Sequence, residues 1–504
     1  MSDRSISTSR VGAPTRPLAP SRLARLFALA ALAGLPAAAH AEEATALLKR
    51  ASAAMGADRL DTLRYAGDGV GFTFGQAFSP GMPWPRITVH SQVRTINYAT
   101  ASMREEIVLS RAEPRGGGGY PITGQQRNDQ YVSGELAWNQ VGQSPAAGPR
   151  FITDRVHQLW VTPHGVLKAA ARNNATVQWV TREGKPMAAV SFTEPGRFAA
   201  TAYLDDQYLV ERVESRIPDP VLGETTVVTR YEGYRDVSGV KFPSRIQQAQ
   251  GGFPVLDLSV KEVVANAPAD IQVPDAVRTA TERVTTEKVA DGVWFVAGGS
   301  HNSVAIEMKD HLVLVEAPLN DGRSEPVIAA VKQLAVGKPI RYVVNSHSHF
   351  DHSGGLRTAV AEGATVVTQA GNKAYFERAF ATPNRIRPDA LARSGKKAKL
   401  VTVDDALQMT DGSRTLQIMR IRSGIHSDTF LMVYLPKERL LIEADAFTPP
   451  PPGTPTPATP NPNNVNLVQN TEGLKLAIDR ILPLHGRVVP LSELYTATGG
   501  KPPQ

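Results

Sequence analysis

The sequence predicts an α+β protein with a β-rich antiparallel domain followed by a layered α/β domain. Between residues 64 and 263, short alternating apolar and polar segments such as "RITVHSQVRTINY" recur, separated by Gly, Pro, Asp and Asn. This period of two is typical of a meandering antiparallel sheet. After residue 280, apolar strands alternate with helical segments, which is typical of sheets covered by helices. The expected division is a β-rich domain at 42–263, a linker at 264–280 and the α/β domain at 281–504.

The first 41 residues resemble a secretory signal. Arg22 and Arg25 precede the apolar run "LFALAALAGLPAAA", and the small-x-small site Ala39-His40-Ala41 follows. Because the run is too short to span a bilayer comfortably, we expect cleavage after Ala41 and a periplasmic or secreted protein. The alternatives are an uncleaved N-terminal anchor and a disordered tail. No other run of 18 apolar residues occurs, so we expect no stable membrane span after cleavage.

Two helices are expected in the first domain, at 42–56 and at 163–172. Gly56 lies just past the first, and Thr162 and Pro163 suit the start of the second. In the second domain, "SEPVIAAVKQLA", "LRTAVAEG" and "TEGLKLAIDRIL" are expected to be helical. The expected strands include "GVWFVAGG", "NSVAIEMKD", "HLVLVEAP", "IRYVVNS", "ATVVTQA", "RTLQIMRIRSG", "TFLMVYLP" and "RLLIEAD".

Charge and cysteine content narrow the function. The net charge of +7 falls to about +3 without the Arg-rich leader, and no basic run is interleaved with aromatics. Nucleic acid is therefore not an expected partner, and a small-molecule substrate is. The 504 residues contain no cysteine, so any metal must be bound by His, Asp or Glu.

The motif "HSHFDH" at 347–352 is the strongest candidate for a metal site. It follows a predicted strand, and residues two apart in an extended segment point the same way. His347, His349 and Asp351 are therefore expected to converge, with His352 turned aside by the loop that follows. Imidazole nitrogens and carboxylate oxygens are zinc ligands. These four groups cannot complete two metal shells by themselves.

Three further candidates lie downstream. His426 and Asp445 follow predicted strands, and His485 follows a predicted helix. Because strand ends collect at one edge of a sheet, these side chains are expected near the motif. The histidines His90, His157, His164, His301 and His311 fit no ligand position, and we expect them to be structural or solvated.

With these residues in order, the chain resembles the metallo-β-lactamase-fold hydrolases over roughly 281–495. The resemblance rests on the motif H-x-H-x-D-H. It implies an αββα sandwich and two Zn²⁺ ions per chain, although other divalent metals are also compatible. By resemblance, the first ion is held by His347, His349 and His426; the second is held by Asp351, His352 and His485; Asp445 bridges them.

The same resemblance implies a reaction. A metal-bound hydroxide would attack the carbonyl of an ester, lactone, thioester or β-lactam, and Asp351 would orient it as a catalytic residue. Two departures leave the substrate open: Glu316-Ala317-Pro318 stands where many members have Asp-Thr-Gly, and Ile425 precedes His426 in place of glycine. The absence of cysteine excludes the β-lactamase subclasses with a thiolate ligand.

The N-terminal half weakly resembles the periplasmic lipoprotein-carrier fold, a half-barrel around a helix, through the segment "YEGYRDVSGVKFPSRI". This leaves a second hypothesis, a periplasmic binding or carrier protein for an apolar ligand with a vestigial metal domain. A nuclease of the same metal fold is a third hypothesis, which export and the mild charge disfavour.

Overall fold

The N-terminal domain is built on one 13-stranded antiparallel sheet in the computed structural model, which describes residues 37–117 and 124–501. The first and last strands of this domain pair at the middle of the sheet, and the chain meanders outward on both sides. The predicted meander is thereby confirmed. The strands are β1 (Thr62–Phe72), β2 (Arg86–Asn97), β3 (Ser102–Arg111), β4 (Gln126–Ser133), β5 (Leu136–Val141), β6 (Ser144–Ala147), β7 (Thr176–Arg182), β8 (Lys185–Glu194), β9 (Phe198–Leu204), β10 (Val210–Asp219), β11 (Gly223–Val237), β12 (Val240–Gln250) and β13 (Phe253–Ala265).

Three helices pack against this sheet: α1 (Ala37–Met55), α2 (Ile152–Trp160) and α3 (Pro163–Arg172). Thr162 caps α3 by accepting a hydrogen bond from the Gly165 amide, as the sequence predicts. Helix α2 was not predicted, because its buried face carries Arg155, which donates to the carbonyls of Tyr131 and Trp138. Helix α1 passes through the expected cleavage point after Ala41, while residues 1–36 of the expected leader lie outside the described residues.

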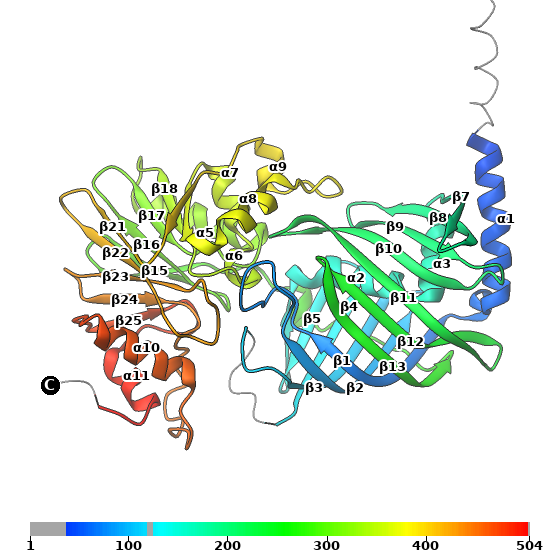
Figure 1. Ribbon diagram of the computed structural model, residues 1–504, viewed down its shortest axis with the longest axis horizontal. Helices are drawn as coiled ribbons and strands as arrows, with labels where there is room; N and C mark the ends of the chain where they lie inside the picture. Colours follow the sequence, from blue (N-terminus) through cyan, green and yellow to red (C-terminus); the bar gives the residue numbers. More distant parts are fainter. Residues whose placement is uncertain (1–36, 118–123, 502–504) are drawn as a thin grey trace, which may run out of the picture.

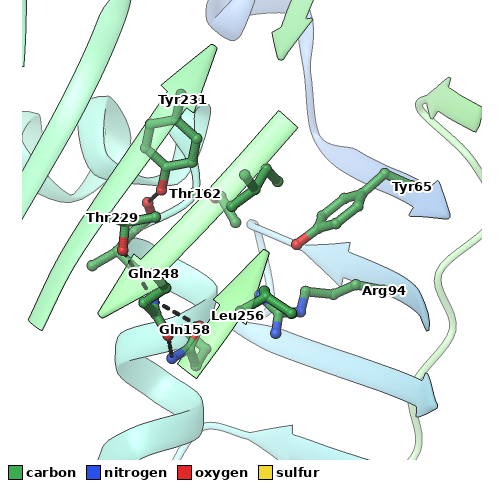
Figure 2. Close-up of a pocket in the computed structure, with 10 residues that line it drawn as sticks. Tyr65, Arg94, Gln158, Thr162, Thr229, Tyr231, Gln248 and Leu256 are labelled. Carbon is green, nitrogen blue, oxygen red and sulfur yellow. Dashed lines mark hydrogen bonds between the residues drawn. The ribbon is translucent and has the colours of Figure 1, made fainter. Parts of the chain in front are cut away.

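A small cavity on the inner side of the sheet is lined by both polar and apolar side chains, among them Arg94, Gln248 and Leu256 (Figure 2). Gln158 donates to Gln248, which donates to the Thr229 hydroxyl. Arg94 forms a buried ion pair with Glu105, 2.6 Å from nitrogen to oxygen. The resemblance to a lipoprotein carrier stays a prediction.

The C-terminal domain contains two sheets packed face to face. Valine side chains of β17 alternate with leucines, so that Val313 and Val315 contact the second sheet and Leu312 and Leu314 face helices. In the seven-stranded sheet the last four strands are parallel. Its strands are β14 (Thr285–Ala290), β15 (Val293–Ala297), β16 (Ser303–Glu307), β17 (Leu312–Val315), β18 (Ile340–Val344), β19 (Thr365–Gln369) and β20 (Leu400–Val403). The six-stranded sheet contains β21 (Ala406–Thr410), β22 (Thr415–Arg420), β23 (Leu431–Leu435), β24 (Leu440–Glu443), β25 (Arg480–Pro483) and β26 (Val489–Pro490).

Helices cover the outer face of each sheet, which completes an αββα sandwich (Figure 1). The first sheet is covered by α5 (Asp321–Leu334), α7 (Leu356–Glu362), α8 (Lys373–Ala381) and α9 (Ala390–Ser394), and the second by α10 (Pro462–Gly473) and α11 (Leu491–Ala497). Within the expected linker lies one short helix, α4 (Asp275–Arg278).

The helix predicted for "TEGLKLAIDRIL" at 471–482 is wrong. Helix α10 ends at Gly473, and β25 begins at Arg480. Ile481 and Leu482 are fully buried, and β25 pairs in parallel with β24. Burial of these two side chains in a sheet therefore overrides the helical pattern of the segment.

Among the described residues, no helix has the length and apolar character needed to cross a membrane.

Candidate metal centre

The candidate ligands meet where several strands of both sheets end. His347 follows β18, Asp445 follows β24, and His485 follows β25. His426 lies in the loop between β22 and β23. All seven residues predicted from the sequence are brought into three overlapping groups whose nitrogen and oxygen atoms lie within 4.8 Å of one another. The prediction that His485 follows a helix is wrong, since it follows a strand.

The first group consists of His347, His349 and His426. The Nε2 atom of His347 lies 2.8 Å from Nδ1 of His349 and 3.1 Å from Nε2 of His426. The third distance, from His349 Nδ1 to His426 Nε2, is 3.0 Å. Three ring nitrogens in such a triangle cannot all be hydrogen-bonded to one another, because each nitrogen is either a donor or an acceptor. Two nitrogens bound to one tetrahedral zinc ion are about 3.3 Å apart, so the triangle has nearly the size of a ligand set.

The second group contains Asp351, His352 and His485. The Nε2 atoms of His352 and His485 are 3.0 Å apart. Asp445 lies between the two groups. Its Oδ2 is 2.7 Å from Nε2 of His352 and 3.5 Å from Nε2 of both His347 and His426, and its Oδ1 is 3.2 Å from Nε2 of His485. This is the place a bridging carboxylate would occupy.

The motif itself is not extended throughout, in contrast to the alternation expected from the sequence. Phe350–Ser353 form a short helix, α6, while His349 keeps an extended backbone. The turn separates Asp351 from His347 and His349 and sends it toward the second group. The expectation that these three residues converge on one side is therefore wrong.

Sequence reasoning missed His301. Its Nε2 lies 3.0 Å from Oδ2 of Asp351, its Nδ1 contacts the Ser300 hydroxyl at 2.8 Å, and the residue is 5 % exposed. With Asp351, His352 and His485 it forms a group that could hold a metal ion. His301 comes after β15, as His347 comes after β18, so the strand-end rule applied to every histidine would have found it.

Glu316 contacts His352 at Nδ1, the ring nitrogen that does not face Asp445. The side chain is fully buried; its Oε2 accepts a hydrogen bond from the Ser346 hydroxyl at 2.5 Å and lies 3.2 Å from Nδ1 of His352. With Nδ1 donating to this carboxylate, Nε2 of His352 faces Asp445. Carboxylates that hold ligand histidines in this way set the tautomer and raise the basicity of the ring. The residue adopts a φ of 71°, a left-handed conformation that costs energy for glutamate.

Burial and neighbouring charges shift the pKa values of the candidate ligands in different directions. Burial lowers the pKa of His349 to about 3 and the pKa of His347 well below its usual value, so both rings are neutral. Burial would also lower the pKa of His352, but the carboxylates of Asp445 and Asp351 raise it well above the ordinary value. Burial would raise the pKa of Asp445, yet the charges of His352 and its neighbours hold it well below.

The donor set fits divalent zinc. It consists of imidazole nitrogens and carboxylate oxygens in two clusters that share one carboxylate. Asp445 Oδ2 is buried and lies 2.7 Å from Nε2 of His352, so its negative charge is compensated there either by a protonated His352 or by a bound cation. The residues could therefore hold two ions, with His347, His349 and His426 at the first and Asp351, His352 and His485 at the second.

Comparison with known proteins agrees with this architecture. The family model of the metallo-beta-lactamase superfamily matches residues 296–488, and the C-terminal region has the metallo-β-lactamase fold. The match is confined to the C-terminal region, and it is compatible with a metal-dependent hydrolase. No curated protein matches the chain.

Several solved structures are similar to the C-terminal part. A metallo-beta-lactamase from Pontibacter korlensis is 18% identical, with 43% of this chain and 98% of that chain covered and a TM-score of 0.33. The metallo-beta-lactamase FIM-1 from Pseudomonas aeruginosa, in its mono-zinc form, is 19% identical, with 43% and 94% covered and a TM-score of 0.33. The flavodiiron protein from Giardia intestinalis is 16% identical, with 43% and 58% covered and a TM-score of 0.32.

Proposed function

We propose that the protein is an exported dinuclear zinc hydrolase that cleaves an ester, lactone, thioester or β-lactam bond. The observation that carries the proposal is the position of Asp445, whose two oxygens lie between the two histidine groups. When bound, two zinc ions would supply an activated water at neutral pH and polarise the scissile carbonyl.

The chain's own residues would orient that reaction. Burial would raise the pKa of Asp351, but the charge of His352 and a hydrogen bond with His301 hold it well below the ordinary value. Asp351 is therefore an ionised acceptor at neutral pH, and it would orient the attacking water by accepting a hydrogen bond from it. A group that positions the nucleophile lowers the entropic part of the barrier.

Access to the site would be from the side of Asp351, Asp445 and His485. The side chains of these residues are 27%, 20% and 18% exposed, respectively. The histidines of the first group are buried. A substrate would therefore approach the second group first, with its carbonyl directed inward.

Export is part of the proposal and rests on the leader predicted over residues 1–41. A periplasmic or extracellular location favours a lactone, ester or β-lactam over a cytosolic glutathione thioester. Mass spectrometry of the mature N-terminus would find Glu42 first; a mature chain that begins at Met1 would contradict export by cleavage.

The function is tested by metal content and turnover together. Elemental analysis should find about two zinc ions per chain. A panel of lactones, esters, thioesters and β-lactams should contain at least one substrate whose hydrolysis is lost with chelator and restored by zinc. Replacement of one ligand in each group, His349→Ala with His485→Ala, should abolish that turnover. Full activity of the metal-free protein would refute the proposal.

A further inference from the structure

A loop of the N-terminal domain lies directly on the candidate metal centre. This loop comprises residues 73–85 and connects β1 to β2. The Phe350 amide at the start of α6 donates to the Gly75 carbonyl at 3.1 Å, and the Asp428 amide donates to the Phe78 carbonyl at 3.0 Å. In Figure 1 the loops at this end of the N-terminal sheet face the metal domain. The two domains are therefore joined at the site.

Aromatic packing fixes the loop in place. The rings of Phe74 and Trp84 contact the Phe350 ring, with centroids 5.1 Å and 5.6 Å apart. Gly75 has a φ of +80°, and a Cβ there would lie 2.5 Å from Phe350 Cγ, so only glycine allows this approach. Phe350 precedes Asp351 directly, and the packing of its ring therefore constrains the backbone of the ligand segment.

Two contacts of the loop reach candidate ligands. The Gln76 side-chain amide donates to Oδ1 of Asp351 at 2.8 Å, and the Ala77 carbonyl lies 3.0 Å from Nε2 of His349. A carbonyl only accepts, so the proton of the neutral His349 ring is on Nε2. Nδ1 then carries the lone pair, and it is Nδ1 that faces His347 and His426.

We propose that the N-terminal domain completes the metal centre, with Gln76 as a positioning residue for Asp351. This inference rests on the proposed dinuclear site. Gln76 holds Oδ1 of Asp351, and this leaves Oδ2 directed toward His301 and His352. Partners outside the ligand shell typically change metal affinity 10–100-fold when removed. The metal affinity of this domain would thus depend on a residue 275 positions away in the sequence.

The test compares Gln76→Leu with Ser79→Ala in the full-length protein. Ser79 lies in the same loop as Gln76, and its hydroxyl donates to Oδ2 of Asp428 in the metal domain. The Ser79→Ala change therefore removes an interdomain hydrogen bond without contacting a candidate ligand. Zinc affinity is measured by competition with a chromophoric chelator, and the ligand field by the absorption spectrum of the cobalt-loaded protein. We expect Gln76→Leu to weaken one of two sites by about 10–100-fold and to shift the spectrum, and Ser79→Ala to change neither.

A second variant keeps the test decisive if Gln76→Leu does not fold. Gln76→Glu has the same size but places an acceptor against Asp351, and it should also weaken one site. If the wild type binds two ions and both Gln76 variants bind them with equal affinity, the positioning role is refuted while the proposed function stands. If the wild type binds no zinc, the proposed function itself fails.

Discussion

Replacing Glu316 with glutamine is expected to weaken the second metal site while leaving the fold intact. The carboxylate accepts hydrogen bonds from Ser346 and His352 at Oε2 and from the Asn345 amide at Oε1. In Glu316→Gln the new carbonyl can take the place of Oε2, but the new amide group then faces the Asn345 amide 3.3 Å away. The new amide group and the amide group of Asn345 are both hydrogen-bond donors, and they would face each other in the protein interior without an acceptor between them.

The magnitude follows from these contacts. One unsatisfied buried donor costs about 1–3 kcal/mol of stability. His352 also exchanges a charged partner for a neutral one, which lowers the basicity of its Nε2. Loss of such a partner reduces metal affinity about 10–100-fold, or about 1.4–2.7 kcal/mol at the site that His352 serves. The first site, which has no direct contact with Glu316, should keep its affinity.

The assay is a chelator-competition titration of wild type and variant, with urea unfolding measured in parallel. Glu443→Gln is the matched control, because Glu443 is also fully buried, lies in the same domain and accepts hydrogen bonds from the backbone amides of Phe447 and Ala446. Burial raises the pKa of Glu443 well above its ordinary value and so favours the uncharged carboxyl, which glutamine matches in size and charge. Two sites of wild-type affinity in Glu316→Gln would refute the assigned role.

Three further predictions concern stability. His157 is fully buried, neither of its ring nitrogens has a hydrogen-bond partner among the described residues, and burial lowers its pKa to about 3. Between about pH 3 and 6.5 the unfolded state therefore binds more protons than the folded state. As the pH is lowered through this window, the free energy of unfolding should decrease, by about 2 kcal/mol at pH 5. In urea melts His157→Leu should make this decrease smaller, and an unchanged pH dependence would contradict the reasoning. Thr162→Val should cost about 1 kcal/mol in calorimetry through loss of the cap on α3, whereas Thr162→Ser should be close to neutral, and equal losses would argue against capping. Zinc at about 100 times its dissociation constant should add about 2.7 kcal/mol to stability over chelated protein, and identical melting curves would speak against binding to the folded state.

Local patterns in the sequence predicted most strands and all seven candidate ligands, for a physical reason. Several of the candidate ligands follow strands, and strand ends are marked by a change from buried apolar residues to polar ones. His347 and Asp445 are examples, since each follows a strand whose residues are mostly buried. The rule that polar residues at strand ends are candidate ligands also applies to His301, which comes after β15 but lies outside the family motif.

Features that depend on distant partners could not be predicted in this way. Residues 480–483 form a strand because β24 offers a parallel edge, and nothing in the segment itself indicates that pairing. Gln76 has no local signal at all, because its partner Asp351 belongs to the other domain. Nor did the alternation rule give the direction of Asp351, which is set by the helical turn α6.

The division between predicted and unpredicted residues has a consequence for substrate selection. The candidate ligand motif alone does not indicate a substrate, and the departures from the family pattern at Glu316 and Ile425 alter no candidate ligand. The loops over the site belong instead to the N-terminal domain: the Gly116 amide donates to the Ile425 carbonyl at 2.9 Å, and Arg115 lies over the Phe78 ring. Since these residues lie beside the loop that carries His426, we expect them to influence which substrate the proposed hydrolase accepts. Substitutions at Arg115 should therefore change KM between substrates more than kcat, and a uniform loss of kcat would contradict this assignment.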